Sequence, residues 1–338
     1  MKQRINWVDY AKGIGIILVV YAHLLSSGLH AGLAIPEHFF LLSDSTVYGF
    51  HMPLFFFLAG LFARQSLLKR GVGDFITDKF RFIAYPYLVW SLLQGSVELF
   101  FSQQSHRGMN VSDLLSIPYL PLGQFWFLYA LFLMYTVYAL LSFLRKAALV
   151  LLILLALLLF VYPIPSEIMA LHGFCTGFLF FVIGLLVKEY SAHWQRYCLP
   201  GWATLGTFFL LIMSSYTLFE YTIEPTRLTD GSHPWYFLFL ACLGILFCIG
   251  LAQYLAKKNC CGVIKILGVH SIQIYLVHML AGVAVRIILL NFFSIENPVL
   301  HMITGVSCGL FVPIVLYKTA MKVRFPYLFE LQKIPYKG

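Results

Sequence analysis

Ten stretches of this chain contain no Asp, Glu, Lys or Arg, and their lengths constrain the fold more than any other feature. Nine have at least 19 residues, and a helix rising ~1.5 Å per residue needs about that many to cross a hydrocarbon core of ~30 Å. The tenth has 16 residues and crosses only if Glu98 lies near an interface. The sequence therefore predicts an all-α polytopic membrane bundle of about ten transmembrane helices. The stretches are 13–36, 45–63, 82–97, 114–144, 147–166, 168–187, 197–219, 231–256, 266–285 and 297–317.

The composition excludes soluble domains. Hydrophobic residues make up 60% of the 338 residues and charged residues 11%, whereas a soluble globular chain has about 25% charged residues. The formal charge of +9 is not evidence for nucleic-acid binding, because the basic residues are distributed by membrane side. The seven cysteines have no paired metal-ligand spacing, so we expect buried, reduced thiols and no metal site.

The lysines and arginines predict the orientation in the membrane. When the flanks of the ten stretches are assigned alternately to two faces, 20 of the 23 basic residues lie on one face and only Arg107, Arg227 and Arg286 on the other. The positive-inside rule then places both termini in the cytoplasm. The longest outer loops, roughly 27–45 and 101–121, are too short to fold alone. We therefore expect residues 1–338 to form a single integral-membrane module.

Polar residues inside a membrane are costly, so each polar residue in stretch 13–36 or just before it is a functional candidate. Lys12 and His23 are eleven residues apart, which in a helix places them on one face about 16 Å apart along the axis, with Asp9 within about 40° of that face. Lys12 could instead be a snorkelling anchor, and His23 a core imidazole bonded to a neighbouring helix. We favour a functional His23, because imidazole takes and returns a proton near neutral pH.

Two further segments carry polar groups. His51 precedes Pro53 near the predicted outer interface, where it is either an interfacial residue or a polar group on the acceptor side. Ser271, Tyr275 and His278 recur at i, i+4 and i+7, which gives one polar stripe on an apolar helix. Such a stripe can bond helices together, but three groups in one span fit the lining of a cavity better.

These residues resemble acyltransferase family 3, the integral-membrane O-acyltransferases, and most of all its short members that acetylate bacterial surface sugars. The matches run in order from residue 4 to about 280. They comprise a basic residue and a His separated by ten residues (Lys12 and His23), Phe56-Phe57-Leu-Ala59-Gly60, Pro-Tyr-Leu-Val-Trp at 86–90, Gly-x-x-Trp-Phe-Leu at 123–128, and Gly-x-x-Ser-x-x-Ile-Tyr-Leu-x-His at 268–278.

The chain departs from the family pattern at two places. The family has Ser before the glycine at position 60, whereas this chain has Ala59, so no hydroxyl role is transferred to that position. The paired arginines of the family correspond here to Lys79 and Arg81 at a different spacing.

The resemblance implies a bacterial inner-membrane enzyme that takes an acetyl group from cytoplasmic acetyl-CoA, with no bound cofactor, and delivers it to a saccharide or lipid-linked saccharide. It implies a catalytic His23 assisted by Lys12, acting as general base or as acyl carrier. The cations Arg64, Lys79 and Arg81 would bind the donor phosphates, although positive-inside topology alone also accounts for such residues. Residues expected to contact the acceptor or line the cavity are Asp9, His51, Trp126, Ser271, Tyr275 and His278.

Two alternatives come from other functional classes. A proton-coupled transporter or flippase would use His23 and His278 as proton relays, but it predicts broken helices in paired halves, and mid-span prolines are few. A non-catalytic sensor or assembly partner would not require Lys12 and His23 on the same face of one helix.

Overall fold

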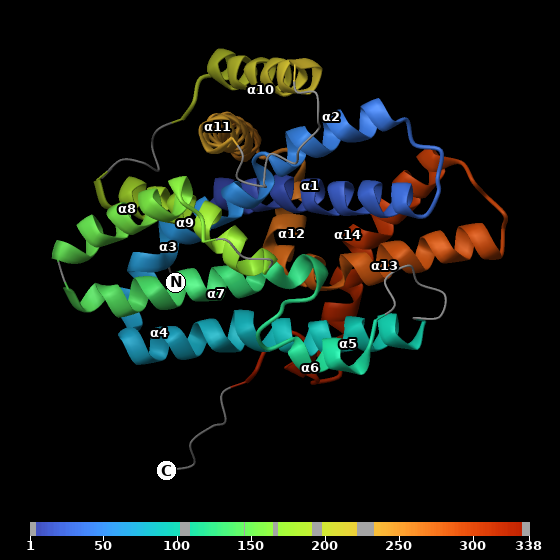
Figure 1. Cartoon of the computed structure of the whole chain (residues 1–338), viewed down its shortest axis with the longest axis horizontal. Helices are drawn as coiled ribbons and strands as arrows, with labels where there is room; N and C mark the ends of the chain where they lie inside the picture. The colour runs from blue at the N-terminus through green and yellow to red at the C-terminus, as the bar shows by residue number, and fades with distance from the viewer. Residues whose placement is uncertain are drawn as a thin grey trace, which may run out of the picture. The chain divides into compact units, whose positions relative to one another are not determined.

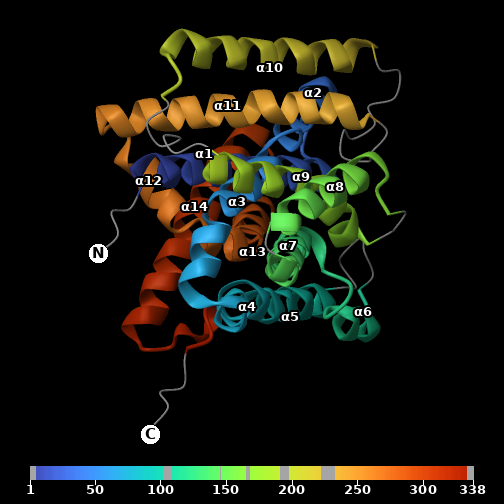
Figure 2. The ribbon, with the colours of Figure 1, turned by 90° about the vertical axis from the view of Figure 1, so that its left-hand side faces the viewer.

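The computed structural model describes residues 5–101, 109–144, 146–164, 168–190, 198–221 and 233–332. These residues form helices and turns, with no β-strand among them (Figures 1 and 2). The prediction of an all-α fold is therefore confirmed for the described chain. The helices are α1 (Asn6–His30), α2 (Glu37–Tyr48), α3 (His51–Arg70), α4 (Val72–Lys79), a π-helical turn (Phe80–Ala84), α5 (Tyr85–Phe100), α6 (Val111–Ser116), α7 (Trp126–Leu141), α8 (Lys146–Val161), α9 (Met169–Tyr190), α10 (Gly201–Tyr221), α11 (Pro234–Lys258), α12 (Gly262–Val269), α13 (Ser271–Asn291) and α14 (Pro298–Lys322).

Seven helical segments of the described residues are long and apolar enough to cross a membrane. The other three predicted stretches are also helical, as α5, α8 and α10, and the first two have only 16 residues each. The seven segments are Asn6–His30, Glu37–Arg70, Gly123–Leu144, Met169–Tyr190, Pro234–Lys258, Ser271–Asn291 and Pro298–Lys322. The count of ten crossings stays a prediction.

The outer loop expected at 27–45 is largely helical, which corrects the sequence interpretation. Helix α1 continues to His30, and α2 begins at Glu37. Glu37 and Asp44 interrupt the charge-free pattern, but they are seven residues apart and so share one face of the helix. Phe40 lies only about 40–60° around the helix from these two charges, and it is buried in one cluster with Leu25. This burial stabilises a helix where the charges had indicated a loop.

The second expected loop, 101–121, also contains a helix. Asn110 and Asp113 form a reciprocal capping box at the start of α6, in which the Asn110 backbone N–H donates to Asp113 Oδ2 at 2.8 Å. This cap satisfies backbone N–H groups that a helix of six residues otherwise leaves open.

The contacts divide the chain into two compact units. The first comprises residues 1–58 and 186–315, and in it α1 packs against α2, α11, α12 and α13. Helices α10 and α11 of this unit lie side by side in both ribbon views (Figures 1 and 2). The second unit comprises residues 59–185 and 316–338, and in it α4 and the π-helical turn pack on α7.

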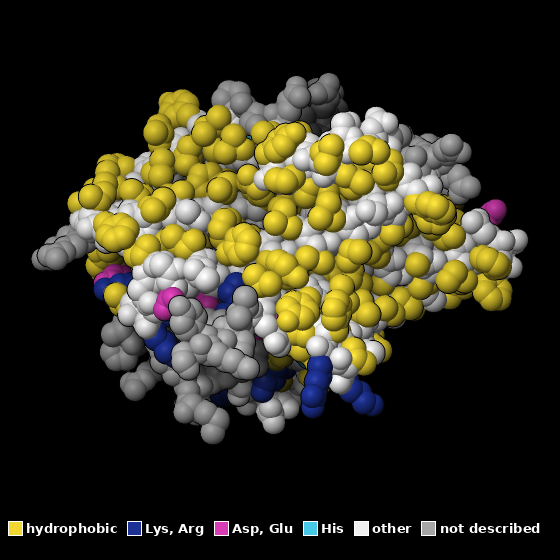
Figure 3. All heavy atoms as spheres, turned by 90° about the horizontal axis from the view of Figure 1, so that it is seen from below, with side chains coloured by type: hydrophobic (Ala, Val, Ile, Leu, Met, Phe, Trp, Pro, Cys, Tyr) yellow, Lys and Arg dark blue, Asp and Glu magenta, His cyan; other side chains and the backbone are white. Residues whose placement is uncertain are grey.

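The surface carries large apolar side chains that water would not tolerate in such number. Phe100 is 81% exposed, and Trp202 and Phe292 are each 79% exposed. Figure 3 shows hydrophobic side chains over much of one face, with Lys and Arg gathered in one part of it. Exposed apolar surface of this extent marks contact with lipid or protein, and the apolar helices identify lipid. The chain is a multi-pass membrane protein.

Candidate active site

Helix α1 is held in the first unit by close contacts between backbones. A methyl group added at Gly13 would collide with the Ile264 carbonyl of α12, and one added at Gly268 with the Asp9 carbonyl of α1. Only glycine permits such an approach, as at other small-residue helix contacts in membranes. Gly268 begins the 268–278 motif, so part of that motif serves packing and fixes α12 and the start of α13 against α1.

His23 of α1 and His278 of α13 meet within this packing. His23 Nδ1 lies 2.9 Å from His278 Nε2, and the two rings are inclined by only 18°. His278 is fully buried, whereas His23 is partly exposed. The two histidines that sequence patterns selected separately, 255 residues apart, therefore form one pair.

The carbonyl groups around His278 set the direction of this hydrogen bond. His278 Nδ1 lies 2.8 Å from the Tyr275 carbonyl oxygen and 3.1 Å from that of Ile274. A carbonyl oxygen only accepts, so we assign the proton of neutral His278 to Nδ1, and its Nε2 is then an acceptor. His23 Nδ1 consequently donates to His278 Nε2. The chain of bonds leaves the Nε2 lone pair of His23 available on the partly exposed ring.

Tyr48, at the end of α2, brings a third histidine to this group. The Tyr48 ring centroid lies 6.2 Å from that of His23 and 4.9 Å from that of His51, the latter edge-on. His51 Nδ1 donates to the Val47 carbonyl at 2.7 Å, which leaves its Nε2 as a buried acceptor with no hydrogen-bond partner among the described residues. His51 is thus a fully buried residue beside the histidine pair.

The remaining candidates of the first unit lie on the same helices. The Tyr275 ring is 5.9 Å from that of His278, whereas Ser271 opens α13 two turns before His278. Asp9 is buried and Lys12 half-buried in the first turns of α1. At ~1.5 Å per residue, Lys12 is about 16 Å from His23 along that helix, too far for direct contact.

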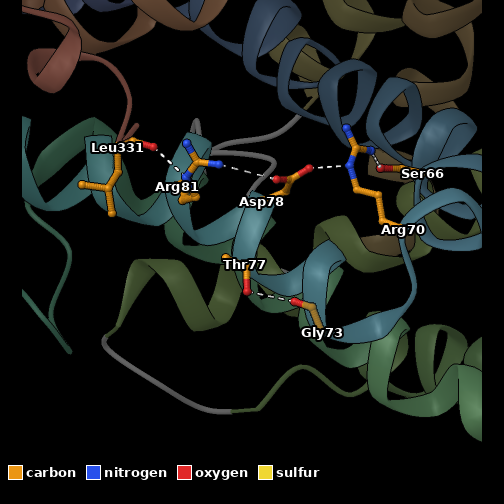
Figure 4. A network of polar contacts seen from close by, with 7 residues as sticks. All are labelled: Ser66, Arg70, Gly73, Thr77, Asp78, Arg81 and Leu331. Atoms are coloured by element: carbon orange, nitrogen blue, oxygen red, sulfur yellow. Dashed lines mark hydrogen bonds and ion pairs between the residues drawn. The ribbon is translucent and has the colours of Figure 1, made fainter. Parts of the chain in front are cut away.

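The candidate donor-binding cations belong to the second unit, and Figure 4 shows the contacts of Arg81 there. Asp78 pairs with Arg70 and lies 3.9 Å from Arg81 Nη1, and Arg81 Nε donates to the Leu331 carbonyl at 2.6 Å. Lys79 Nζ lies 4.0 Å from the centroid of the Tyr135 ring, a cation–π geometry. Arg64 is exposed on α3.

Two motif positions of the second unit have a packing role. The Trp126 indole at the start of α7 lies where a side chain at Gly173 of α9 would be, so this glycine makes room for the ring. Gly60 brings α3 against the Phe181 carbonyl of α9, where a side chain would not fit.

Sequence reasoning missed two parts of the site. Tyr48 carried no signal beyond its place three residues before His51. Arg286 was counted only as an outer basic residue, although it is the single charged residue of α13. Its Nη1 donates to Ser27 Oγ at 2.6 Å, one turn beyond His23 on α1.

A family model described as "Acyltransferase domain" matches residues 5–318, which include the histidine pair and the candidate donor-binding cations. The chain belongs to acyltransferase family 3. This match favours the enzyme over the transporter and the non-catalytic partner that the sequence had left open.

Two curated relatives are similar over part of the chain. Nodulation protein NolL of Sinorhizobium fredii is 31% identical over 183 residues, which are 51% of this chain and 47% of the relative. Nodulation protein NolL of Mesorhizobium japonicum is 26% identical over 181 residues, 51% of this chain and 46% of the relative. The matches thus span about half the length of these relatives. No solved structure matches the chain.

Proposed function

We propose that this acyltransferase moves an acetyl group from cytoplasmic acetyl-CoA to a hydroxyl of a cell-surface saccharide or glycolipid. The observation that carries the proposal is the ordered bond from His23 Nδ1 to His278 Nε2, with His278 Nδ1 bound to backbone carbonyls. It gives His23 one fixed tautomer and one available basic nitrogen.

In the general-base route, His23 Nε2 takes the proton of the acceptor hydroxyl while the oxygen attacks the thioester carbonyl. The C–S bond breaks, and the CoA thiolate leaves with the proton returned by His23. His278 Nε2 accepts from the imidazolium during this step and stabilises it, as the third group of a catalytic triad does. His278 is thus a positioning residue that acts through His23.

In the covalent route, the same Nε2 lone pair attacks the thioester carbonyl, and the C–S bond breaks to release the CoA thiolate. The acceptor oxygen then attacks the acetyl group on Nε2, the N–C bond breaks, and the hydroxyl proton passes to the thiolate. Both routes use the same atom, so the geometry serves either. Incubation with acetyl-CoA in the absence of acceptor distinguishes them, because only the covalent route gives an acetylated His23 peptide in mass spectrometry.

We place donor recognition at Arg64, Lys79 and Arg81. Asp78 is the carboxylate that faces both Arg70 and Arg81, so one negative charge faces two positive ones. The cation–π contact of Lys79 leaves its charge in place. A surplus of positive charge supports the binding of the CoA phosphates.

For the acceptor, we propose that the polar groups around the histidine pair line its path. Tyr275 and His51 support this because their rings lie close to His278 and Tyr48. We assign Ser271 to the same role and Lys12 to assistance of His23 from their family motifs, and Asp9 to this role from its place near the face of α1 that carries Lys12 and His23. Trp126 stays a candidate for acceptor contact from its family motif alone.

We also propose ten crossings, both termini in the cytoplasm, and residues 1–338 as one module of a bacterial inner membrane. The excess of basic residues on one face supports the orientation. The finding that each of the ten charge-free stretches contains a helix supports the count.

The function is tested with the purified chain in lipid nanodiscs, acetyl-CoA, and surface glycans extracted from a strain that lacks the gene. We expect release of the CoA thiol that depends on the glycans, together with ester-linked acetyl groups on them. Thiol release without acetylated product, or no dependence on the glycans, would contradict the proposal.

A further inference from the structure

Arg286 lies at the contact between the two helices that carry the histidine pair. It is the single charged residue of α13, and its Nη1 donates to Ser27 Oγ of α1 at 2.6 Å. Ser27 is four residues after His23, which is about 6 Å along α1. Gly282, one turn after His278, admits Leu24 of α1, so α1 and α13 stay close between the histidines and the arginine.

The guanidinium has unused binding capacity. It carries five N–H donors, one of which goes to Ser27. Among the residues that the structure describes, Arg286 forms no ion pair with a carboxylate. It is half-exposed within an apolar helix, where a charge is costly without a counter-charge. An anion at this position would offset that cost.

We propose that Arg286 binds an anionic group of the acceptor, a phosphate or carboxylate carried next to the sugar whose hydroxyl meets His23. The inference rests on the proposed function and specifies its acceptor class. The separation of Ser27 from His23 along α1 is comparable with the width of one sugar ring. Arginine suits this task, because its planar fork binds carboxylate and phosphate oxygens through two parallel hydrogen bonds.

Two sources supply this chemistry, a lipid-linked sugar phosphate and an acidic sugar. Three probes separate them: a hexosamine linked to a prenyl diphosphate, an octyl hexuronide, and a neutral octyl hexosaminide. Binding of each to the full chain in nanodiscs of zwitterionic lipid is measured by titration calorimetry, and acetyl transfer from acetyl-CoA is measured in parallel. The variants are R286Q, R286K and, as a matched charge control, K258Q at the exposed end of α11.

We expect the wild type to bind one anionic probe roughly 10- to 100-fold more tightly than the neutral one, the span of a charge-assisted pair. R286Q should lose this preference, R286K should keep part of it, and K258Q should keep all of it. The preferred probe identifies the source of the anion.

Equal binding of anionic and neutral probes by the wild type would overturn the inference, as would a preference that survives in R286Q. If R286Q lowers only the melting temperature, Arg286 merely joins α1 to α13 and the inference is also wrong. Failure of the proposed function looks different, because anionic binding would then persist without acetyl transfer to any acceptor.

Discussion

The two units of the molecule use their polar residues in opposite ways. In the first unit, His23 Nδ1 donates to His278 Nε2, and His278 Nδ1 donates to backbone carbonyls. This order leaves the Nε2 lone pair of His23 available. In the second, Arg81 contacts Asp78 and the Leu331 carbonyl, and the Lys79 ammonium lies against Tyr135. The comparison teaches that a polar residue in a membrane protein is a catalytic candidate when its own bonds leave one reactive atom free.

The largest expected effect tests the histidine pair of the first unit. His23→Gln should lower kcat by roughly 10²- to 10⁴-fold, because the amide keeps a hydrogen-bonding group but cannot shuttle a proton. The melting temperature should stay near that of the wild type, since the amide can still donate to His278. Turnover within about threefold of the wild type would show that His23 is a core residue.

A smaller effect is expected at the positioning residue. His278→Leu removes the acceptor for His23 Nδ1, and kcat should fall roughly 10- to 100-fold, as for other residues that orient a histidine. His278→Gln should retain more activity, because its carbonyl oxygen can accept from His23. KM for acetyl-CoA should not change in either variant. Equal loss in both would mean that packing, and not the acceptor atom, matters at His278.

Removal of positive charge tests the candidate donor-binding cations of the second unit. Lys79→Gln and Arg81→Gln should each raise KM for acetyl-CoA by about 3- to 5-fold, since partly solvated ion pairs contribute ~1 kcal/mol or less. kcat should change little. Arg81→Lys serves as the control that keeps the charge but loses the fork geometry. Unchanged KM in both charge-removal variants would restrict these cations to structural roles.

The smallest effect separates stability from donor binding in the same unit. Trp90 Nε1 donates to the Leu328 carbonyl at 2.6 Å, and its ring packs on Phe329. Trp90→Phe removes the hydrogen bond and should destabilise the protein by ~1 kcal/mol, with KM for acetyl-CoA unchanged. A rise in KM equal to that of Arg81→Gln would show that the C-terminal segment itself shapes the donor site.

Much of the fold followed from the sequence, because apolar helices must satisfy their backbone groups internally wherever they cross lipid. Helix α2 could not be predicted from the sequence, because the burial of Phe40 outweighed the charges of Glu37 and Asp44. His23 and His278 could each be selected, but their contact joins residues 255 positions apart, and no periodicity within one helix reveals it. The role of Lys79 was equally hidden, because a basic residue near a membrane end carries the same sequence signal whether it binds phosphate or packs on Tyr135.

The central claim is the tautomer order that leaves the lone pair on His23 Nε2, and nitrogen NMR of the full chain labelled at its histidine ring nitrogens tests it most directly. His23→Gln and His278→Gln provide the assignments. The account predicts that both rings carry their proton on Nδ1 near neutral pH, with unprotonated Nε2 in each. A proton on His23 Nε2 in the free protein would contradict it.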